Sequence, residues 1–218
     1  MKVIFCIPGN NFSNGFLKCW TNLTKELHKR DIEYELINEY TPNIYQVRGL
    51  LLGASIQYGP TQHPWQGKKE YDYIMWIDSD QVFEPEHFFK LLKHDKDIVS
   101  GLYLSKPKED GLEAIPTLFS CIIDDHEAGG APRNLWTHEI NGELIKVRAN
   151  GMGWMLIKKG VFEKIDYPWF YPVHTNDGVG IHGEDISFQI RAKDVGFDSY
   201  VDTSIIVGHE KEVVLNLF

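Results

Sequence analysis

The chain has 218 residues, of which 43% are hydrophobic and 24% charged, and its formal net charge is -9. This is the composition of a folded globular protein with room for a sizeable core, and it excludes a disordered or low-complexity chain. The acidic balance, without a cluster of lysine and arginine, disfavours a nucleic-acid-binding surface, and no apolar stretch approaches the roughly 20 residues of a membrane span.

The first third of the chain alternates between strand and helix patterns. Residues 3–7 form a β-rich apolar run that ends at Pro8, and residues 16–29 carry apolar side chains at helical spacing. Residues 32–37 predict a second strand, and Pro42 lies where a second helix could start. The apolar face of that helix is expected to contain Val47, Leu50, Leu51, Ala54 and Ile56.

The third predicted strand ends in two carboxylates. Residues 73–77 are continuously apolar, as in a central parallel strand covered on both faces, and residues 84–93 predict the helix that follows. Three β–α units in a row predict a parallel sheet with right-handed crossovers. Ligands of such sheets collect at the carboxyl ends of the strands, so we expect Pro8, Glu39 and Asp78 at one edge.

The pattern changes after Leu104. The segments "IPTLFSCII" and "GELIKVRANGMGWMLIKK" contain strands without long helices between them, which predicts α+β structure added to the sheet. Residues 167–185 form a long segment rich in proline, glycine and aromatic residues, as expected of a lid or binding loop. Residues 186–195 predict a helix that Gly196 ends, and residues 198–207 predict the last strand.

Asp78 and Asp80 are the first candidates for chemistry. They are two residues apart, so just beyond a strand they can converge on one point. Two carboxylates that close repel each other unless a cation lies between them or one of them takes a proton. Mg²⁺ and Mn²⁺ are ions that carboxylates and phosphates bind together. The alternative is a solvated acidic turn that caps the following helix.

Polar residues near the chain's end could belong to the same site. His209 follows the last apolar run, and its imidazole could complete an oxygen-rich site and favour Mn²⁺, or it could be structural. Lys211 could contact a bound anion or be a solvated cation. Glu184 and Asp185 fall in the first turn of a helix, where acids are stabilising by about 0.3–1 kcal/mol. One of them could instead be a general base that deprotonates a hydroxyl.

Gly151 and Gly153 precede a predicted strand. Two glycines in three residues indicate a turn or bulge, or a place where a ligand approaches the backbone closely. Their spacing does not match the GxGxxG fingerprint, so NAD binding is not supported. In the aromatic loop, Trp169 could stack on a sugar or anchor the loop.

Six segments together resemble GT-A fold glycosyltransferases, in particular family 2-like enzymes, including those of phages and large DNA viruses. They are "IPGNN", "YQVRGLLLGA", "YIMWIDSDQVFEPEHF", "NGMGWMLIKK", "HGEDISFQIRAKDVG" and "VGHEK", and they span nearly the whole chain. The resemblance implies one catalytic domain over residues 1–218 with a mostly parallel, three-layer α/β fold. It also implies a nucleotide-binding half, residues 1–104, and an acceptor-binding half, residues 105–218.

The resemblance also implies a role for each candidate residue. Asp78, Asp80 and His209 would hold Mn²⁺ or Mg²⁺, and Asp185 would be the base of an inverting reaction, with Glu184 as its substitute. The positions that would contact the donor nucleotide are Pro8, Glu39, Arg48, Asp78, Ser79 and Lys211. Those that would contact the sugar or the acceptor are Gly151, Met152, Gly153, Trp169 and His182.

The implied activity is transfer of a sugar from a nucleotide-diphosphate sugar, with a UDP-sugar favoured, to a glycan, glycoprotein or other hydroxyl acceptor. The expected location is the cytoplasm, or the host cytoplasm if the protein is viral. The short length and the apolar ending "VVLNLF" are compatible with a place in a longer polypeptide.

Two other interpretations stay open. "DSDQV" also fits the DxDx[T/V] motif of haloacid-dehalogenase-type, Mg²⁺-dependent phosphatases, although that family carries its motif on the first strand of the chain. A non-catalytic module that binds a sugar nucleotide is the other, because a fold alone does not determine a function.

Overall fold

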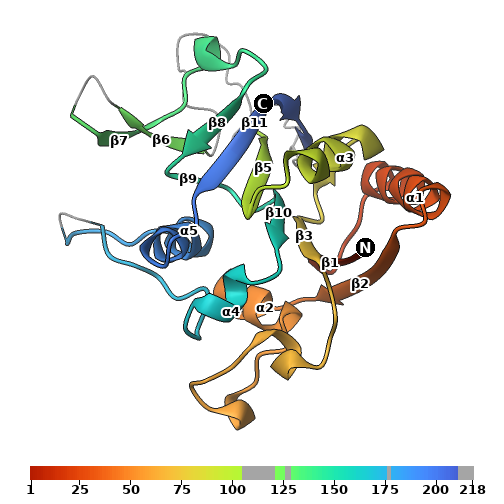
Figure 1. The fold of residues 1–218 in the computed structure, drawn as a ribbon, viewed down its shortest axis with the longest axis horizontal. Coiled ribbons are helices and arrows are strands. Elements are labelled where there is room, and N and C mark those ends of the chain that lie inside the picture. The colour runs from red at the N-terminus through yellow and green to blue at the C-terminus, as the bar shows by residue number, and fades with distance from the viewer. Residues whose placement is uncertain (105–120, 126–128, 176–177, 211–218) are drawn as a thin grey trace, which may run out of the picture.

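The structure, a computed structural model, describes residues 1–104, 121–125, 129–175 and 178–210 (Figure 1). Its centre is a seven-stranded sheet with the strand order β2-β1-β3-β10-β5-β11-β8. β10 and β8 run antiparallel to the other five, so the sheet is mostly parallel, as predicted. The strands are β1 (Lys2–Pro8), β2 (Glu33–Glu39), β3 (Tyr73–Ile77), β5 (Ile98–Leu102), β8 (Leu144–Val147), β10 (Trp154–Lys158) and β11 (Ser199–Ile206).

Helices cover both faces of this sheet, which gives three layers (Figure 1). α1 (Asn14–Lys29) and α3 (Pro85–His94) pack on one face. α2 (Ile44–Leu51), α4 (Val161–Lys164) and α5 (Glu184–Asp194) pack on the other. Short 3-10 turns lie at Ile56–Tyr58, Pro64–Gly67 and Thr137–Glu139.

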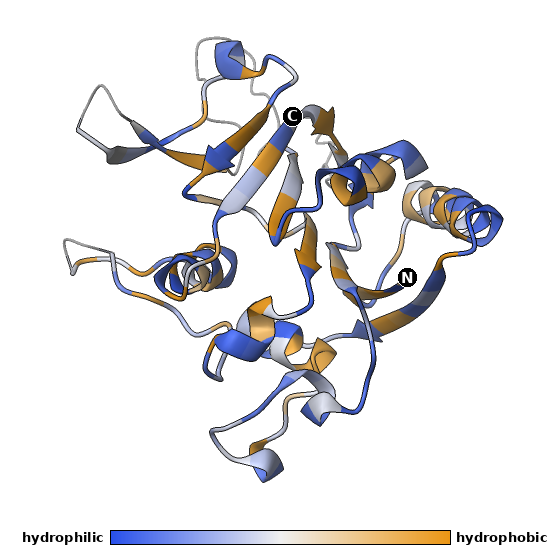
Figure 2. Cartoon of the chain, viewed as in Figure 1, coloured by the Kyte–Doolittle hydropathy of each residue, from blue (hydrophilic) through white to orange (hydrophobic). Residues whose placement is uncertain are grey.

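Successive side chains of a strand point to opposite faces of the sheet, so each central strand contributes to two separate hydrophobic cores. In β1, Ile4 and Cys6 point to the layer that contains α2 and α5, whereas Val3, Phe5 and Ile7 point to α1 and α3. Figure 2 shows the hydrophobic colour concentrated on the central strands. Because both faces are covered, a central strand needs apolar residues at every position, which explains the continuous apolar sequence of β3.

Two small sheets accompany the main one. β4 (Gln81–Val82) pairs with β12 (Gly208–His209), and this pairing brings the C-terminal part of the described chain back to the end of β3. β6 (Cys121–Asp125), β7 (Ala131–Asn134) and β9 (Ala149–Asn150) form a three-stranded sheet. Over the described residues, we find no helix that combines the length and the apolar character needed to cross a membrane.

The second helix is shorter than its apolar pattern indicates. It begins at Ile44, after Asn43 accepts hydrogen bonds from the backbone N–H groups of Tyr45 and Gln46. It ends at Leu51, and Gly53 follows in a left-handed conformation, with φ at 75°. The expected apolar face was therefore wrong at its far end, because Ile56 is 96% exposed.

The strand after the "NGMG" segment is part of the main sheet rather than an addition to it. β10 inserts antiparallel between β3 and β5, with Trp154 opposite Ile77. This insertion sets the backbone of Gly153 beside the carboxyl end of β3.

Candidate functional site

The carboxyl ends of β1, β2 and β3 meet at one edge of the sheet, as the sequence predicted. Pro8 pairs with Glu39 in the register of β1 and β2, and the N–H of Gly9 donates to the carbonyl of Glu39 at 3.0 Å. A cavity of about 350 Å³ opens at this edge. Its lining comprises Pro8, Gly9, Tyr40, Thr41, Pro42, Ile44, Val47, Asp78, Ser79 and Asp80. Glu39 is exposed beside this cavity and does not line it.

Arg48 connects the end of β3 to the first turn of α5. Its guanidinium is buried, with Nη2 3.2 Å from Oδ1 of Asp78 and Nε 3.0 Å from Oε1 of Glu184. Burial works to lower the pKa of Arg48, but the two carboxylates outweigh it and hold that pKa above its ordinary value. Arg48, which was predicted to contact the nucleotide, here binds two carboxylates from the interior of the protein.

Asp78 is held from the other side by the segment that precedes β10. Its backbone N–H donates to the carbonyl of Gly153 at 3.0 Å, and the N–H of Gly153 donates to the hydroxyl of Tyr103 at 3.2 Å. Gly151, Met152 and Gly153 are all buried. Burial raises the pKa of Asp78, and the charge of Arg48 opposes that rise. Gly153, one of the predicted substrate-binding residues, thus lies directly against the first aspartate of the motif.

Replacing Gly153 by Ala is expected to destabilise the protein by about 1–3 kcal/mol, the usual cost of overpacking a filled site. A Cβ atom there would lie 2.9 Å from Oδ2 of Asp78 and 3.0 Å from Nε2 of Gln81. Gly49→Ala is the matched control, because its Cβ atom would meet nothing closer than 3.6 Å. Within a helix, alanine is also more favourable than glycine by about 0.5–1 kcal/mol. Urea unfolding of both variants checks this, and a Gly153→Ala variant as stable as the wild type would contradict it.

His209 reaches Asp80 through the pairing of β12 with β4. Its Nε2 lies 2.9 Å from Oδ2 of Asp80, and its Nδ1 lies 2.6 Å from the carbonyl of Leu104. The N–H of Glu210 donates to the backbone carbonyl of Asp80 at 2.8 Å, which fixes the approach of the two segments. Lys211, the predicted anion contact, lies outside the described residues.

The donor set at this edge suits a divalent cation. If Nδ1–H of His209 donates to Leu104, the lone pair of Nε2 faces the Asp80 carboxylate, an arrangement that a cation between them favours. When each ligand atom of an octahedral ion is about 2.1 Å from the metal, neighbouring ligand atoms lie about 3 Å apart. The distance of 2.9 Å between Nε2 of His209 and Oδ2 of Asp80 is similar. Within the described ranges, however, no group of three His, Cys, Asp or Glu side chains is already gathered in metal-binding geometry. Asp78 is turned towards Arg48.

Glu184 and Asp185 have different environments in the first turn of α5. Glu184 is buried and accepts a hydrogen bond from Arg48. Asp185 is half-buried and accepts a hydrogen bond from the N–H of Ile186 at 2.8 Å. Burial and then the charge of Glu184 raise the pKa of Asp185 to about 6. Of the two acids, Asp185 has the properties of a general base near neutral pH.

The two candidate residues of the aromatic loop, Trp169 and His182, have different surroundings. The ring of Trp169 is fully buried, and its Nε1–H donates to the carbonyl of Phe162 at 3.1 Å, which anchors the loop. His182 is half-buried, and its carbonyl accepts hydrogen bonds from the hydroxyls of Tyr45 and Ser187.

Sequence reasoning missed two residues of this site. Tyr40 is exposed at the rim of the cavity that Asp78 and Asp80 line. The side chain of Gln81 is fully buried, and neither amide atom has a hydrogen-bond partner among the described residues. Gln81 directly follows the two aspartates and precedes two apolar residues. A polar residue in that position is the sequence signal that could have identified Gln81 as part of the site.

The fold is the GT-A fold that the sequence resemblance implied. No protein-family model matches the chain, and no curated protein matches it in sequence. Among solved structures, A197 from STIV is similar, with a TM-score of 0.57 and 21% identity over 97% of this chain and 87% of that one. GalNAc-T7, solved with UDP, GalNAc and Mn²⁺, also gives a TM-score of 0.57, with 11% identity. There the match covers 97% of this chain but only 43% of GalNAc-T7. At these identities the similarity concerns the fold.

Proposed function

We propose that the protein is a metal-dependent glycosyltransferase that moves a sugar from a nucleotide-diphosphate sugar, with a UDP-sugar favoured, to a glycan or other hydroxyl acceptor. The observation that carries this proposal is the bridge of Arg48, which binds Asp78 at the end of β3 and Glu184 in the first turn of α5. It ties Asp78, one of the carboxylates that would hold a donor's metal, to the helix that presents Asp185. Glycosyltransferases among the structural neighbours support the same class of reaction.

The residues at the sheet edge divide the work between binding and proton transfer. The cavity lined by Pro8, Tyr40 and Ser79 is of a size to take part of a nucleotide. Asp80 and His209 would hold Mn²⁺ or Mg²⁺, together with Asp78 once the donor is bound. When bound, the cation stabilises the negative charge that develops on the departing diphosphate.

Asp185 would accept the proton of the acceptor hydroxyl as this oxygen attacks the anomeric carbon of the donor sugar. In that step the new bond forms between the acceptor oxygen and the anomeric carbon, and the bond from that carbon to the diphosphate oxygen breaks. The carboxylate must be charged to act, and a pKa of about 6 leaves it charged at neutral pH while keeping it a useful base. Attack from the side opposite the leaving group inverts the anomeric centre.

The phosphatase alternative fits this arrangement less well. The DSD motif follows β3, the third strand of the chain, rather than the first. Its first aspartate, the nucleophile in that family, is bound by the buried Arg48. A binding module without turnover differs from our proposal in one respect, namely that it has no use for a carboxylate base at Asp185.

Binding of nucleotides tests the donor site directly. We expect UDP with Mn²⁺ or Mg²⁺ to raise the melting temperature, because a ligand at 100 times its Kd adds about 2.7 kcal/mol of stability. GDP and dTDP, each with metal or with chelator, identify the base, and Asp80→Ala is expected to lose the metal-dependent shift.

Asp97→Ala is the matched control, since this exposed aspartate directly precedes β5 and so lies at the opposite edge of the sheet. An equal nucleotide shift in wild type and Asp80→Ala, or none with any nucleotide, would sink the proposed donor site. A phosphate-ester screen would then take precedence.

A further inference from the structure

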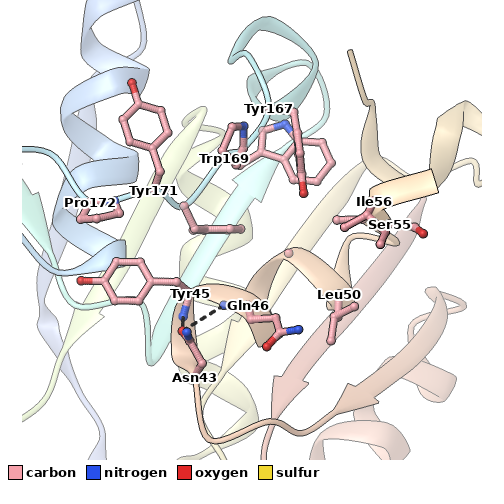
Figure 3. A pocket seen from close by; sticks show the side chains of 14 residues that line it. Asn43, Tyr45, Gln46, Leu50, Ser55, Ile56, Tyr167, Trp169, Tyr171 and Pro172 are labelled. Carbon is pink, nitrogen blue, oxygen red and sulfur yellow. Dashed lines mark hydrogen bonds between the residues drawn. The ribbon is translucent and has the colours of Figure 1, made fainter. Parts of the chain in front are cut away.

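A second cavity lies on the side of α2 that faces away from the two aspartates. Its volume is about 580 Å³, larger than the cavity at the sheet edge. Ile44 and Val47 of α2 line the sheet-edge cavity, whereas Tyr45, Gln46 and Leu50 line this one. Figure 3 shows these side chains opposite the segment 167–172, with Ser55 and Ile56 at one end. We refer to this cavity as the α2 groove.

The wall opposite α2 is fixed before any ligand arrives. Nη1 of Arg191, on α5, donates to the carbonyls of Pro168 at 2.6 Å and Trp169 at 3.0 Å. Nη2 of the same side chain donates to the carbonyl of Asp166 at 2.6 Å. The guanidinium also lies 4.1 Å from the centre of the Tyr171 ring and covers one face of it. A groove with a fixed wall spares a ligand the cost of ordering it.

The lining of the α2 groove suits a neutral ligand that carries many hydroxyl groups. Among the described residues, none of the side chains that line it carries a formal charge. Tyr167, Tyr171 and two prolines provide flat apolar surface, of the kind that packs against the C–H face of a sugar ring. Gln46 is exposed and lines the groove, and its amide has both a donor and an acceptor to offer.

Tyr45 connects the α2 groove to the proposed base. Its hydroxyl donates to the carbonyl of His182 at 3.4 Å, just before the first turn of α5. The pKa of Tyr45 is raised, first by burial and then by the charges of Glu184 and Asp185. A chain molecule lying in the groove would therefore extend towards Asp185.

We propose that the α2 groove binds a neutral oligosaccharide, namely the inner sugar units of an acceptor whose terminal hydroxyl meets Asp185. This assignment of the acceptor rests on the proposed function, whereas the affinity of the groove for neutral saccharides does not depend on it.

Saccharide titrations with two groove variants test the proposal. The probes are neutral trisaccharides of glucose, galactose, mannose, xylose and N-acetylglucosamine, measured by saturation-transfer NMR and calorimetry on the full chain. We expect at least one to bind, and its affinity to fall about tenfold in Gln46→Leu and in Tyr171→Ala. Tyr58→Ala is the matched control, because this tyrosine is 48% exposed and lies outside the groove lining. Gln46 is exposed, so its replacement leaves the fold intact.

The same proteins titrated with UDP and Mn²⁺ separate the two proposals. Unchanged UDP binding in the groove variants, with saccharide binding lost, supports the inference. Failure of every trisaccharide to bind the wild type, or equal binding in Gln46→Leu and Tyr171→Ala, overturns it while leaving the donor site intact. Saccharide binding that depends on Gln46 in a protein that binds no nucleotide would keep the groove as a saccharide site and overturn the proposed function.

Discussion

Replacing Asp185 by Asn is expected to lower the rate of sugar transfer by about 10²–10⁴-fold, the usual contribution of a positioned general base. The affinity for UDP and metal should be unchanged, since the cavity at the sheet edge is lined by Asp78 and Asp80 and not by Asp185. Transfer from a UDP-sugar, followed as release of UDP in the presence of an acceptor, measures the effect.

The pH dependence of the wild type provides a second readout of Asp185. Its pKa is raised to about 6, and the active form is the carboxylate, so the rate is expected to rise with pH up to about 6 and then level off. A fall in rate below pH 6 that disappears in the variant assigns the titration to this residue. Transfer within a few-fold of the wild type in Asp185→Asn would instead indicate that Glu184 is the base or that the reaction is a retaining one without a base.

Stability separates loss of the base from loss of the fold. An aspartate in an unfolded chain has a pKa of about 3.9, so the folded protein binds this proton more tightly than the unfolded one. The wild type therefore gains stability as the pH falls from about 6 to about 4 through this group, and above pH 6 its charge is unfavourable. Asp185→Asn is expected to be at least as stable as the wild type at pH 7, so a loss of activity cannot be attributed to unfolding.

The elements that sequence patterns predicted well are those whose own residues carry a clear pattern. β1 and α1 each bury apolar residues at strand or helix spacing, so periodicity was sufficient to find them, whereas β2 was found from its strand-forming residues although most of it is exposed. β3 is buried on both faces, and its continuous apolar run showed this directly. The position of Asp78 at the carboxyl edge then followed from the general rule for parallel sheets.

The features that sequence patterns did not predict depend on contacts between distant segments. Nothing in the sequence of β10 indicates that it inserts antiparallel between β3 and β5. Arg48 lies on a helix whose pattern gives no sign that its charge is buried between residues 78 and 184. Trp169 was expected in a binding loop, but its burial depends on packing against Phe162.

Replacing Arg48 by Met is expected to destabilise the protein by about 3–5 kcal/mol, the range for removing one partner of a buried ion pair. The methionine fills similar volume, but Glu184 and Asp78 would keep their charges without the guanidinium that compensates them. Lys159→Met is the matched control, because its pair with Glu70 is on the surface, where such a pair contributes about 0–1 kcal/mol. Urea unfolding at pH 7 gives both differences.

A double variant decides whether the loss comes from the uncompensated charge. In Arg48→Met combined with Glu184→Gln, one of the two orphaned carboxylates is neutral, so part of the lost stability should return, and the two changes should not be additive. Additive losses would mean that Arg48 stabilises the fold by packing over Trp76, whose ring lies 5.3 Å from the guanidinium carbon, rather than by charge. If the charge dominates, the bridge that ties Asp78 to the first turn of α5 is also what allows Glu184 to be buried and Asp78 to be half-buried at this edge of the sheet.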